Sequence, residues 1–378
     1  MIRVGIDVRE LGGRPTGVGR YLRELLVRWQ ADAACAQVDL VLFTPDPQLE
    51  AHWRPHGGGG ATLTWQHVPG RGRTIWEQHD LARAARQARL DVFFAPAYTA
   101  PLRLDVPTVV VMHDVSFAAH PEWFPWRHGL RMRRLASWSA RRARALITMS
   151  AFSAAEIECF IGIPAARVQV IPLAVDYHDS PAPAGRRAGP MLPSPPPTVL
   201  YVGSIFDRRH VPLLMQGVAR ARAHLRSLRL VVIGENRTST RQDLAALADA
   251  LGIRDAVGLH DYVTDDVLRA AYSDAGVFAF LSEYEGFGLT PLEAMRQGLP
   301  AIVLDTPVAR EVYGEGAEYV RRGDADGVAR AIVDLLTNAD YRAERIAAGD
   351  ATVAGYRWKE TARATWDVIR TVAEGRES

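Results

Sequence analysis

Short apolar runs alternate with segments of helical periodicity along almost the whole chain. Apolar runs of this kind are typical of parallel strands buried on both faces, so the alternation predicts an α/β protein with doubly wound sheets. The expected strands are Ile2–Ile6, Val38–Phe43, Asp91–Phe94, Thr108–Met112, Leu146–Met149, Val168–Ile171, Thr198–Val202, Leu230–Ile233, Ala256–Leu259, Gly276–Phe280 and Ala301–Leu304. The expected helices are Val18–Trp29, Trp76–Ala88, Trp126–Arg144, Ala151–Phe160, His210–His224, Thr240–Leu251, Asp265–Ser273, Leu289–Gln297, Asp326–Leu336 and Arg357–Glu374.

A proline-rich segment over residues 179–197 interrupts this alternation. Proline lacks the backbone N–H that a strand needs and favours extended conformations, so we interpret this segment as a linker. It separates a first domain, residues 1–178, from a second, residues 198–356. A helix over residues 357–378 can pack back on the first domain. Two doubly wound domains joined in this way create a cleft, and ligands bind such sheets at the carboxyl ends of their strands.

Composition narrows the classes of protein that fit. The 378 residues are 48% hydrophobic and 23% charged, which is typical of a globular protein of about two domains. The start of the chain reads as a buried strand, and no apolar run approaches the roughly 20 residues that span a bilayer, so we expect a cytoplasmic protein. Cys35 and Cys159 are too few for a disulfide framework. Lys359 is the sole lysine and lies near the end of the sequence. A cation that binds phosphate elsewhere in the chain must therefore be arginine.

The most informative stretch is SEYEGFGLTPLEAMRQGLP, residues 282–300. It follows an expected strand and contains the start of a helix, where Pro291 suits the first turn. The free backbone N–H groups of Phe287–Thr290 would form an anion site there, and the glycines at 286 and 288 would allow close approach of a phosphate. Glu285 in the turn and Glu293 in the helix would flank this site. One carboxylate would bind the hydroxyls of a sugar, and the other a ribose diol.

Together with other segments, this stretch resembles the retaining glycosyltransferases of family 4, which have the GT-B fold of two Rossmann-like domains facing a central cleft. The resemblance covers nearly the whole chain in order, through GIDVREL, PTGVGRYLRELL, VVVMHDVSF, ITMSAFSAAEI, VLYVGSIFDRRHVPLLMQGV and LVVIGENR. Its most specific part is the Glu-x7-Glu signature in EGFGLTPLEAMRQGLP.

The resemblance implies a role for each matching position. It places Glu285 on the transferred sugar and Glu293 on the nucleotide ribose, with His113 near the reacting sugar and acceptor. The diphosphate would contact Arg208 and Arg209, where the family more often has arginine followed by lysine. The other expected donor contacts are Gly17, Gly19, Ser204, Gly286, Phe287, Gly288, Leu289 and Thr290. At the position of Ser204, relatives often have a further arginine.

We expect neither a metal nor a nucleic-acid partner. Asp324-Ala325-Asp326 superficially resembles the metal-binding DxD of other glycosyltransferases, but it precedes a helical stretch and reads as an N-cap. The arginines are not accompanied by any recognised nucleic-acid-binding module. The glycines of PTGVGR lack the spacing of a dinucleotide fingerprint.

The segments HDVSFAAHPEWF and GSIFDRRH are similar to those of bacterial mannosyltransferases of polysaccharide assembly. They favour GDP-mannose as the donor and a glycan or lipid-linked molecule as the acceptor. UDP-glucose and UDP-N-acetylglucosamine stay open as donors. A UDP-sugar 2-epimerase of the same fold is an alternative, and a non-catalytic module that binds nucleotide or membrane is another.

Residues 122–144 are strongly basic. Three aromatic residues precede seven arginines, and no acidic residue follows Glu122. A basic helix flanked by aromatic side chains can lie on an anionic membrane surface, so the segment is a candidate for peripheral membrane contact. An ordinary amphipathic helix packed on the first sheet is the alternative.

Overall fold

The computed structural model describes residues 1–13, 16–53, 58–70, 72–176, 196–238 and 241–375. The chain divides into two compact units. The first, called the N-terminal unit here, comprises Met1–His178 and Arg357–Ser378. The C-terminal unit comprises Asp179–Tyr356. The expected linker at 179–197 lies outside the described residues except for its last two prolines.

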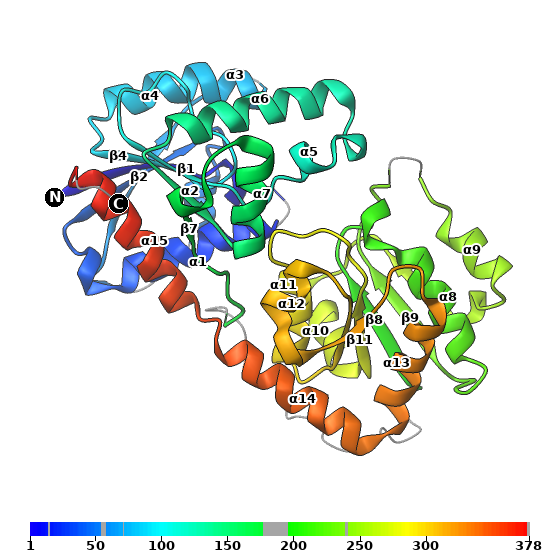
Figure 1. Cartoon of the computed structure of the whole chain (residues 1–378). Coiled ribbons are helices and arrows are strands. Elements are labelled where there is room, and N and C mark those ends of the chain that lie inside the picture. The colour runs from blue at the N-terminus through cyan, green and yellow to red at the C-terminus, as the bar shows by residue number, and fades with distance from the viewer. Residues whose placement is uncertain (14–15, 54–57, 71, 177–195, 239–240, 376–378) are drawn as a thin grey trace. The chain divides into compact units, whose positions relative to one another are not determined.

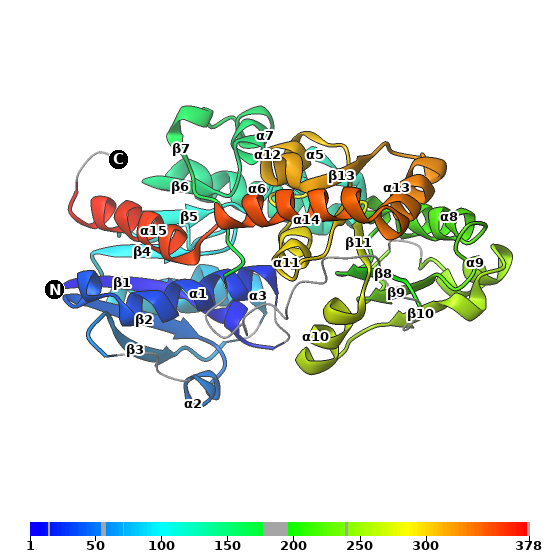
Figure 2. The same cartoon turned by 90° about the horizontal axis from the view of Figure 1, so that it is seen from below.

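The N-terminal unit, drawn from blue to green and in red in Figure 1, is built on a seven-stranded parallel sheet. Its strand order, β3-β2-β1-β4-β5-β6-β7, can be followed in Figure 2. Its strands are β1 Ile2–Asp7, β2 Val38–Thr44, β3 Thr62–His67, β4 Val92–Ala95, β5 Thr108–Val111, β6 Ala145–Thr148 and β7 Val168–Val170. The strand order reverses direction at β1, which lies between β2 and β4. Ligands of doubly wound folds bind at such a point, beyond the carboxyl ends of the strands.

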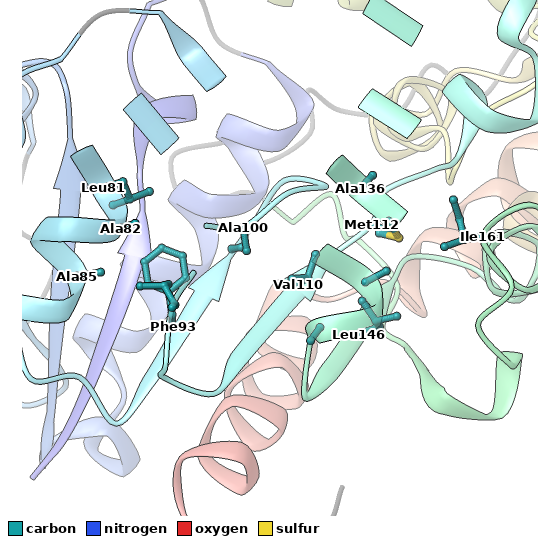
Figure 3. Close-up of a cluster of buried hydrophobic side chains, with 14 of the residues drawn as sticks. Leu81, Ala82, Ala85, Phe93, Ala100, Val110, Met112, Ala136, Leu146 and Ile161 are labelled. Atoms are coloured by element: carbon teal, nitrogen blue, oxygen red, sulfur yellow. The ribbon is translucent and has the colours of Figure 1, made fainter. Parts of the chain in front are cut away.

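Helices cover both faces of this sheet. They are α1 Gly17–Ala31, α2 Leu49–His52, α3 Arg73–Ile75, α4 Ala82–Gln87, α5 Ser116–Ala119, α6 Trp126–Arg142, α7 Ala151–Ile161 and α15 Trp358–Ala373, with a π-helix at Trp76–Leu81. One face is packed by α4, α6 and α7, whose small and branched side chains meet Phe93, Val110 and Leu146 of the sheet (Figure 3). The alanines at 82, 85 and 136 allow these helices to lie close to the strands.

The last helix belongs to the N-terminal unit. Side by side, α15 and α1 pack on the sheet (Figure 2). Trp29 of α1 stacks edge-on against Phe94 and Trp366, and its indole N–H donates to the Ala362 carbonyl oxygen at 2.9 Å. Trp358 is fully buried. The chain therefore returns to its first unit after completing the second.

The C-terminal unit has a six-stranded parallel sheet in the order β10-β9-β8-β11-β12-β13. Its strands are β8 Thr198–Val202, β9 Arg229–Ile233, β10 Val257–His260, β11 Val277–Phe280, β12 Ala301–Leu304 and β13 Ala317–Val320. Its helices are α8 Val211–Ala221, α9 Leu244–Ala250, α10 Asp265–Asp274, α11 Leu289–Arg296, α12 Pro307–Tyr313, α13 Ala325–Thr337 and α14 Ala339–Ala354. Here the order reverses at β8, between β9 and β11.

The predicted α/β class and parallel sheets are confirmed, and the structure adds the short helices α2, α3 and α5 and four further elements. The edge strands β3 and β13 were not predicted, because Thr62–His67 is half exposed and Ala317–Val320 mixes polar with apolar residues. Helices α12 and α14 were not predicted either. The expected helix Trp76–Ala88 begins with a π-helical turn, and π-helical turns in proteins frequently occur at functional sites.

Candidate active site

Two loops of the C-terminal unit meet at the carboxyl edge of its sheet. One follows β8 and carries Arg208 and Arg209 in a short 3-10 turn, Asp207–Arg209. The other follows β11 and carries Glu285. Because β8 and β11 are paired strands, the residues that follow them are neighbours, although they are about 75 positions apart in the sequence.

Arg209 is held in place from several sides. Its Nε group donates to Glu285 Oε1 at 2.9 Å, and its Nη2 group lies 2.9 Å from the same oxygen in an ion pair. Its Nη1 group donates to the Ser204 carbonyl oxygen at 2.9 Å. The guanidinium carbon lies 4.9 Å from the ring centre of Phe280. Burial acts to lower the pKa of Arg209, but Glu285 and Tyr201 together outweigh it and raise the pKa. The guanidinium is therefore a fixed positive charge at the strand ends.

Glu285 is oriented by a residue that the sequence did not single out. The Ser282 hydroxyl donates to Glu285 Oε1 at 2.9 Å. Arg208 lies in the same loop as Arg209, with its guanidinium 4.4 Å from the Phe206 ring centre. The structure thus brings together Arg208, Arg209, Glu285 and the Ser204 carbonyl oxygen, as the sequence predicted for one site.

The start of α11 depends on one glycine. Gly288 is the N-cap with φ of +87°, a left-handed conformation that side-chain-bearing residues rarely adopt. Its carbonyl oxygen accepts a hydrogen bond from the buried Tyr313 hydroxyl at 2.8 Å. A Cβ atom at position 288 would lie only 2.1 Å from that hydroxyl oxygen. Burial raises the pKa of Tyr313 well above its ordinary value, so the hydroxyl stays a donor.

The N–H groups of the first turn of α11 lack a carbonyl partner one turn earlier and carry the positive end of the helix dipole. Leu289 and Thr290, at the start of this turn, are half-buried, whereas Gly286 and Phe287 are buried. Glu293 lies on the next turn, where the Tyr272 hydroxyl donates to its Oε2 at 3.5 Å. Anions of phosphate size are suited to such a helix start.

A cavity of about 410 Å³ opens beside the arginine loop. The loops after β8, β9 and β10 and the start of α9 line it, through Ile205, Gly234, Asn236, Leu244, Leu259 and His260 among others. The Gln242 amide on its wall donates to Asp207 Oδ1 at 2.9 Å and so joins the cavity to the 3-10 turn of Arg208 and Arg209. Its volume is typical of small-molecule sites, and sequence reasoning did not predict it.

In the N-terminal unit, His113 lies just beyond β5 at the carboxyl edge of the sheet. It is buried between the rings of Tyr21 and Tyr98, and its Nε2 contacts the Pro96 carbonyl oxygen at 2.8 Å. Because a carbonyl only accepts, Nε2 carries the proton. Burial lowers the pKa of His113 below its ordinary value, so the ring is neutral near pH 7 and Nδ1 is its acceptor.

The two glycines of the N-terminal segment lie in the first turn of α1, whose start we expected one residue later. Thr16 caps this helix by accepting from the Gly19 N–H at 3.0 Å. A Cβ atom on Gly19 would lie 2.4 Å from the Glu10 carbonyl oxygen, whereas Gly17 faces open space. Gly19 is therefore required by packing against the protein's own backbone.

A buried cluster at the end of β1 was missed by sequence reasoning. Asp7 Oδ2 lies 2.7 Å from Arg9 Nη2, and the same guanidinium contacts Glu77 of the π-helix. Thr99 donates to Glu77 Oε2 at 2.8 Å. Burial raises the pKa of Asp7 to about 6, with Arg9 acting in the opposite direction. The cluster links β1 to the π-helix beside the strand ends.

Two other expectations concern surface features. Asp324 accepts from the Gly327 N–H at 2.7 Å and caps α13, as predicted.

The basic segment forms α6, which buries Ala136, Ser139 and Ala140 and exposes Trp126, Leu130 and Trp138. In the described ranges, no helix is both long and apolar enough to cross a membrane.

Comparison with known proteins agrees with this architecture. Residues 15–179 match the model "Glycosyltransferase Family 4", and residues 187–351 match "Glycosyl transferases group 1". The chain is 26% identical over 360 residues to O-antigen chain mannosyltransferase B of Escherichia coli, covering 91% of this chain and 93% of that protein. It is 33% identical over 172 residues to GDP-mannose:cellobiosyl-diphosphopolyprenol alpha-mannosyltransferase of Komagataeibacter xylinus, covering 45% and 44%.

Among solved structures, sucrose-phosphate synthase from Thermosynechococcus elongatus aligns with 99% of this chain and 100% of its own, with a TM-score of 0.73 and 18% identity. At this identity the likeness concerns the fold, and that fold is GT-B. The two family models together account for both halves of the chain. The chain belongs to the glycosyltransferases of GT-B fold, with a family 4 domain followed by a group 1 domain.

Proposed function

We propose that the protein transfers mannose from GDP-mannose to a glycan or lipid-linked acceptor, on the cytoplasmic side of a membrane and with retention of anomeric configuration. The observation that carries this proposal is the meeting of Arg209 and Glu285 beside the start of α11. A fixed cation and a helix start suit the diphosphate of the donor, and a carboxylate suits the hydroxyls of its sugar.

In the proposed step, the bond between the anomeric carbon and the diphosphate oxygen breaks while the acceptor hydroxyl forms a new bond on the same face of the sugar. The acceptor proton passes to the departing phosphate oxygen. Negative charge therefore grows on the diphosphate, where Arg208, Arg209 and the N–H groups at the start of α11 would stabilise it. Because these groups are already in place, we propose that no metal is needed.

The remaining contacts follow from the geometry of each unit. The cavity beside Asp207 would hold the nucleoside, and Glu293 would accept hydrogen bonds from the ribose diol. A neutral His113 would accept a hydrogen bond through Nδ1 from a hydroxyl of the sugar or acceptor. The names of the relatives O-antigen chain mannosyltransferase B and GDP-mannose:cellobiosyl-diphosphopolyprenol alpha-mannosyltransferase support mannose and GDP as the donor components.

A product assay tests this proposal. GDP-mannose, UDP-glucose and UDP-N-acetylglucosamine are each incubated with the protein and EDTA, using p-nitrophenyl α-mannoside and a polyprenyl diphosphate disaccharide as acceptor probes. We expect GDP release that depends on an acceptor, and a product whose anomeric NMR signal matches the configuration of the donor. Release of UDP from UDP-N-acetylglucosamine without acceptor, with formation of the 2-epimer, would instead identify an epimerase. Loss of turnover in EDTA would contradict metal independence.

We also propose that α6 contacts an anionic membrane surface. Its buried residues share one side, and the opposite side carries Arg127, Arg131 and Arg134 together with Leu130 and Trp138. No acidic residue occurs in this helix. Arginines interspersed with exposed apolar side chains suit the phosphate and acyl boundary of a membrane, where a lipid-linked acceptor would lie.

Charge reversal tests this surface. The variant Arg131→Glu/Arg134→Glu is expected to lose co-sedimentation with vesicles containing phosphatidylglycerol, because each basic residue near such a surface contributes about 1 kcal/mol to binding. The matched control is Arg226→Glu/Arg363→Glu, which changes the net charge by the same amount. Arg226 is exposed on the loop after α8, and Arg363 is exposed on α15. Equal binding by both variants and the wild type would remove α6 from the proposal.

A further inference from the structure

His210 has an unusual backbone conformation next to the proposed phosphate site. It follows Arg209 directly and is the N-cap of α8, with φ of +44° and ψ of +40°. Residues other than glycine are uncommon in this left-handed conformation, although asparagine, aspartate and histidine are found there more often than other side chains. The His210 side chain makes no capping hydrogen bond to α8. It therefore does not serve to cap the helix.

The His210 side chain instead reaches across to the other loop of the site. Its Nε2 lies 3.0 Å from Glu283 Oε2, across 73 positions in the sequence. The same carboxylate oxygen lies 2.9 Å from Arg322 Nη1, which follows β13. His210 and Glu283 have side chains only 20% and 18% exposed, so water weakens this contact less than it does a surface pair. We call these three residues the His210 tether.

Two residues of the His210 tether, His210 and Glu283, are next to the groups that would bind the donor, in the same two loops. Glu283 is two residues before Glu285, and its N–H donates to the Arg208 carbonyl oxygen at 2.9 Å. The two loops are thus joined by a backbone hydrogen bond, by the tether and by the Arg209–Glu285 ion pair. A bound donor would compete for the third of these contacts, since its diphosphate would also accept hydrogen bonds from Arg209 and its sugar hydroxyls would donate to Glu285.

We propose that the His210 tether is a positioning device for donor binding. It keeps the loop of Arg208 and Arg209 at a fixed distance from the loop of Glu285 when the donor competes for the ion pair between Arg209 and Glu285. This inference rests on the proposed function. His210, Glu283 and Arg322 act through Arg209 and Glu285, and we assign them no contact with the reacting atoms.

Two substitutions at His210 test the side-chain contact. His210→Asn is suited to the left-handed backbone but is too short to place a donor where Nε2 lies. His210→Gln places an amide donor near the Nε2 position. Affinity is measured by calorimetry, well below the melting temperature of each variant, for whichever of GDP and UDP the wild type binds more tightly. We expect His210→Asn to weaken affinity about tenfold and His210→Gln to stay within about threefold of wild type.

Glu283→Ala provides a second route that leaves the residue at position 210 unchanged. It should weaken affinity as much as His210→Asn, and the double variant should be no weaker than either single variant, because both remove the same contact. The inference is overturned if His210→Asn binds the nucleotide as tightly as the wild type while His210→Gln binds it more weakly. It is also overturned if the losses of affinity in the two single variants add up in the double variant. A wild-type protein that binds neither nucleotide would overturn the proposed function itself, and this inference with it.

Discussion

The variant Arg209→Ala is expected to lose about 10²–10³-fold in kcat/KM for the nucleotide sugar, as is typical when one preorganised donor to a developing negative charge is removed. In the structure, Arg209 is the cation fixed by Glu285, Ser204 and Phe280 at the strand ends. Steady-state kinetics with varied donor concentration measure this loss. Arg209→Lys should recover only part of the activity, because an ammonium group supplies the charge without the forked pair of N–H groups.

A control is needed because Arg209→Ala also leaves Glu285 without its cation. Glu285→Gln and the double variant Arg209→Ala/Glu285→Gln remove the uncompensated charge. If the loss in Arg209→Ala came only from a misplaced Glu285, the double variant would be as active as Glu285→Gln alone. The proposed role predicts that the double variant is less active than Glu285→Gln. Thermal melting of each variant establishes that the folded protein is being compared.

The variant Gly288→Ala is expected to destabilise the protein by about 2 kcal/mol or more and to abolish measurable nucleotide binding. A left-handed residue with a Cβ atom costs about 1–2 kcal/mol, and overpacking adds a further penalty. The overlap here is severe, since the new Cβ atom would lie 2.1 Å from the Tyr313 hydroxyl oxygen. Relief of the overlap would shift the start of α11, and with it the N–H groups that face the phosphate. Chemical denaturation and calorimetry measure the two effects.

Tyr313→Phe separates the overlap from the backbone strain. This substitution removes the hydroxyl that both collides with the new Cβ atom and donates to the Gly288 carbonyl oxygen. The double variant Gly288→Ala/Tyr313→Phe should be less destabilised than the sum of the two single changes. Strict additivity would show that Tyr313 and position 288 do not interact as the structure places them.

The sequence predicted the central strands of both sheets because these strands are buried on both faces and read as continuous apolar runs. The edge strands β3 and β13 mix polar with apolar residues and lack that signal, so they were found only from the structure. The α-helical period also fails at Trp76–Leu81, where a π-helical turn directs Glu77 toward Arg9. Local patterns do not reveal this arrangement, because Glu77 and its partner Arg9 are 68 positions apart in the sequence.

In the candidate site, too, some residues could be predicted from the sequence and others only from the structure. Glu285, Gly288 and Glu293 lie within one short stretch, so their spacing in the sequence was informative. Ser282 belongs to that stretch, but nothing in the pattern assigns it a partner. Tyr313 and Glu283 act through partners 25 and 73 positions away. Contacts of that kind arise only when the parallel strands bring their following loops together.

The most direct test of the central claim is nucleotide binding by the wild type and by Glu293→Ala. Thermal unfolding is followed with GDP, UDP, ADP and dTDP and their sugars, with and without EDTA. We expect stabilisation by one nucleotide family, unaffected by EDTA and lost in the variant. At about 100 times the dissociation constant, the ligand should add about 2.7 kcal/mol to the free energy of unfolding. No stabilisation by any nucleotide, or equal stabilisation of the variant, would contradict the site described for the C-terminal unit.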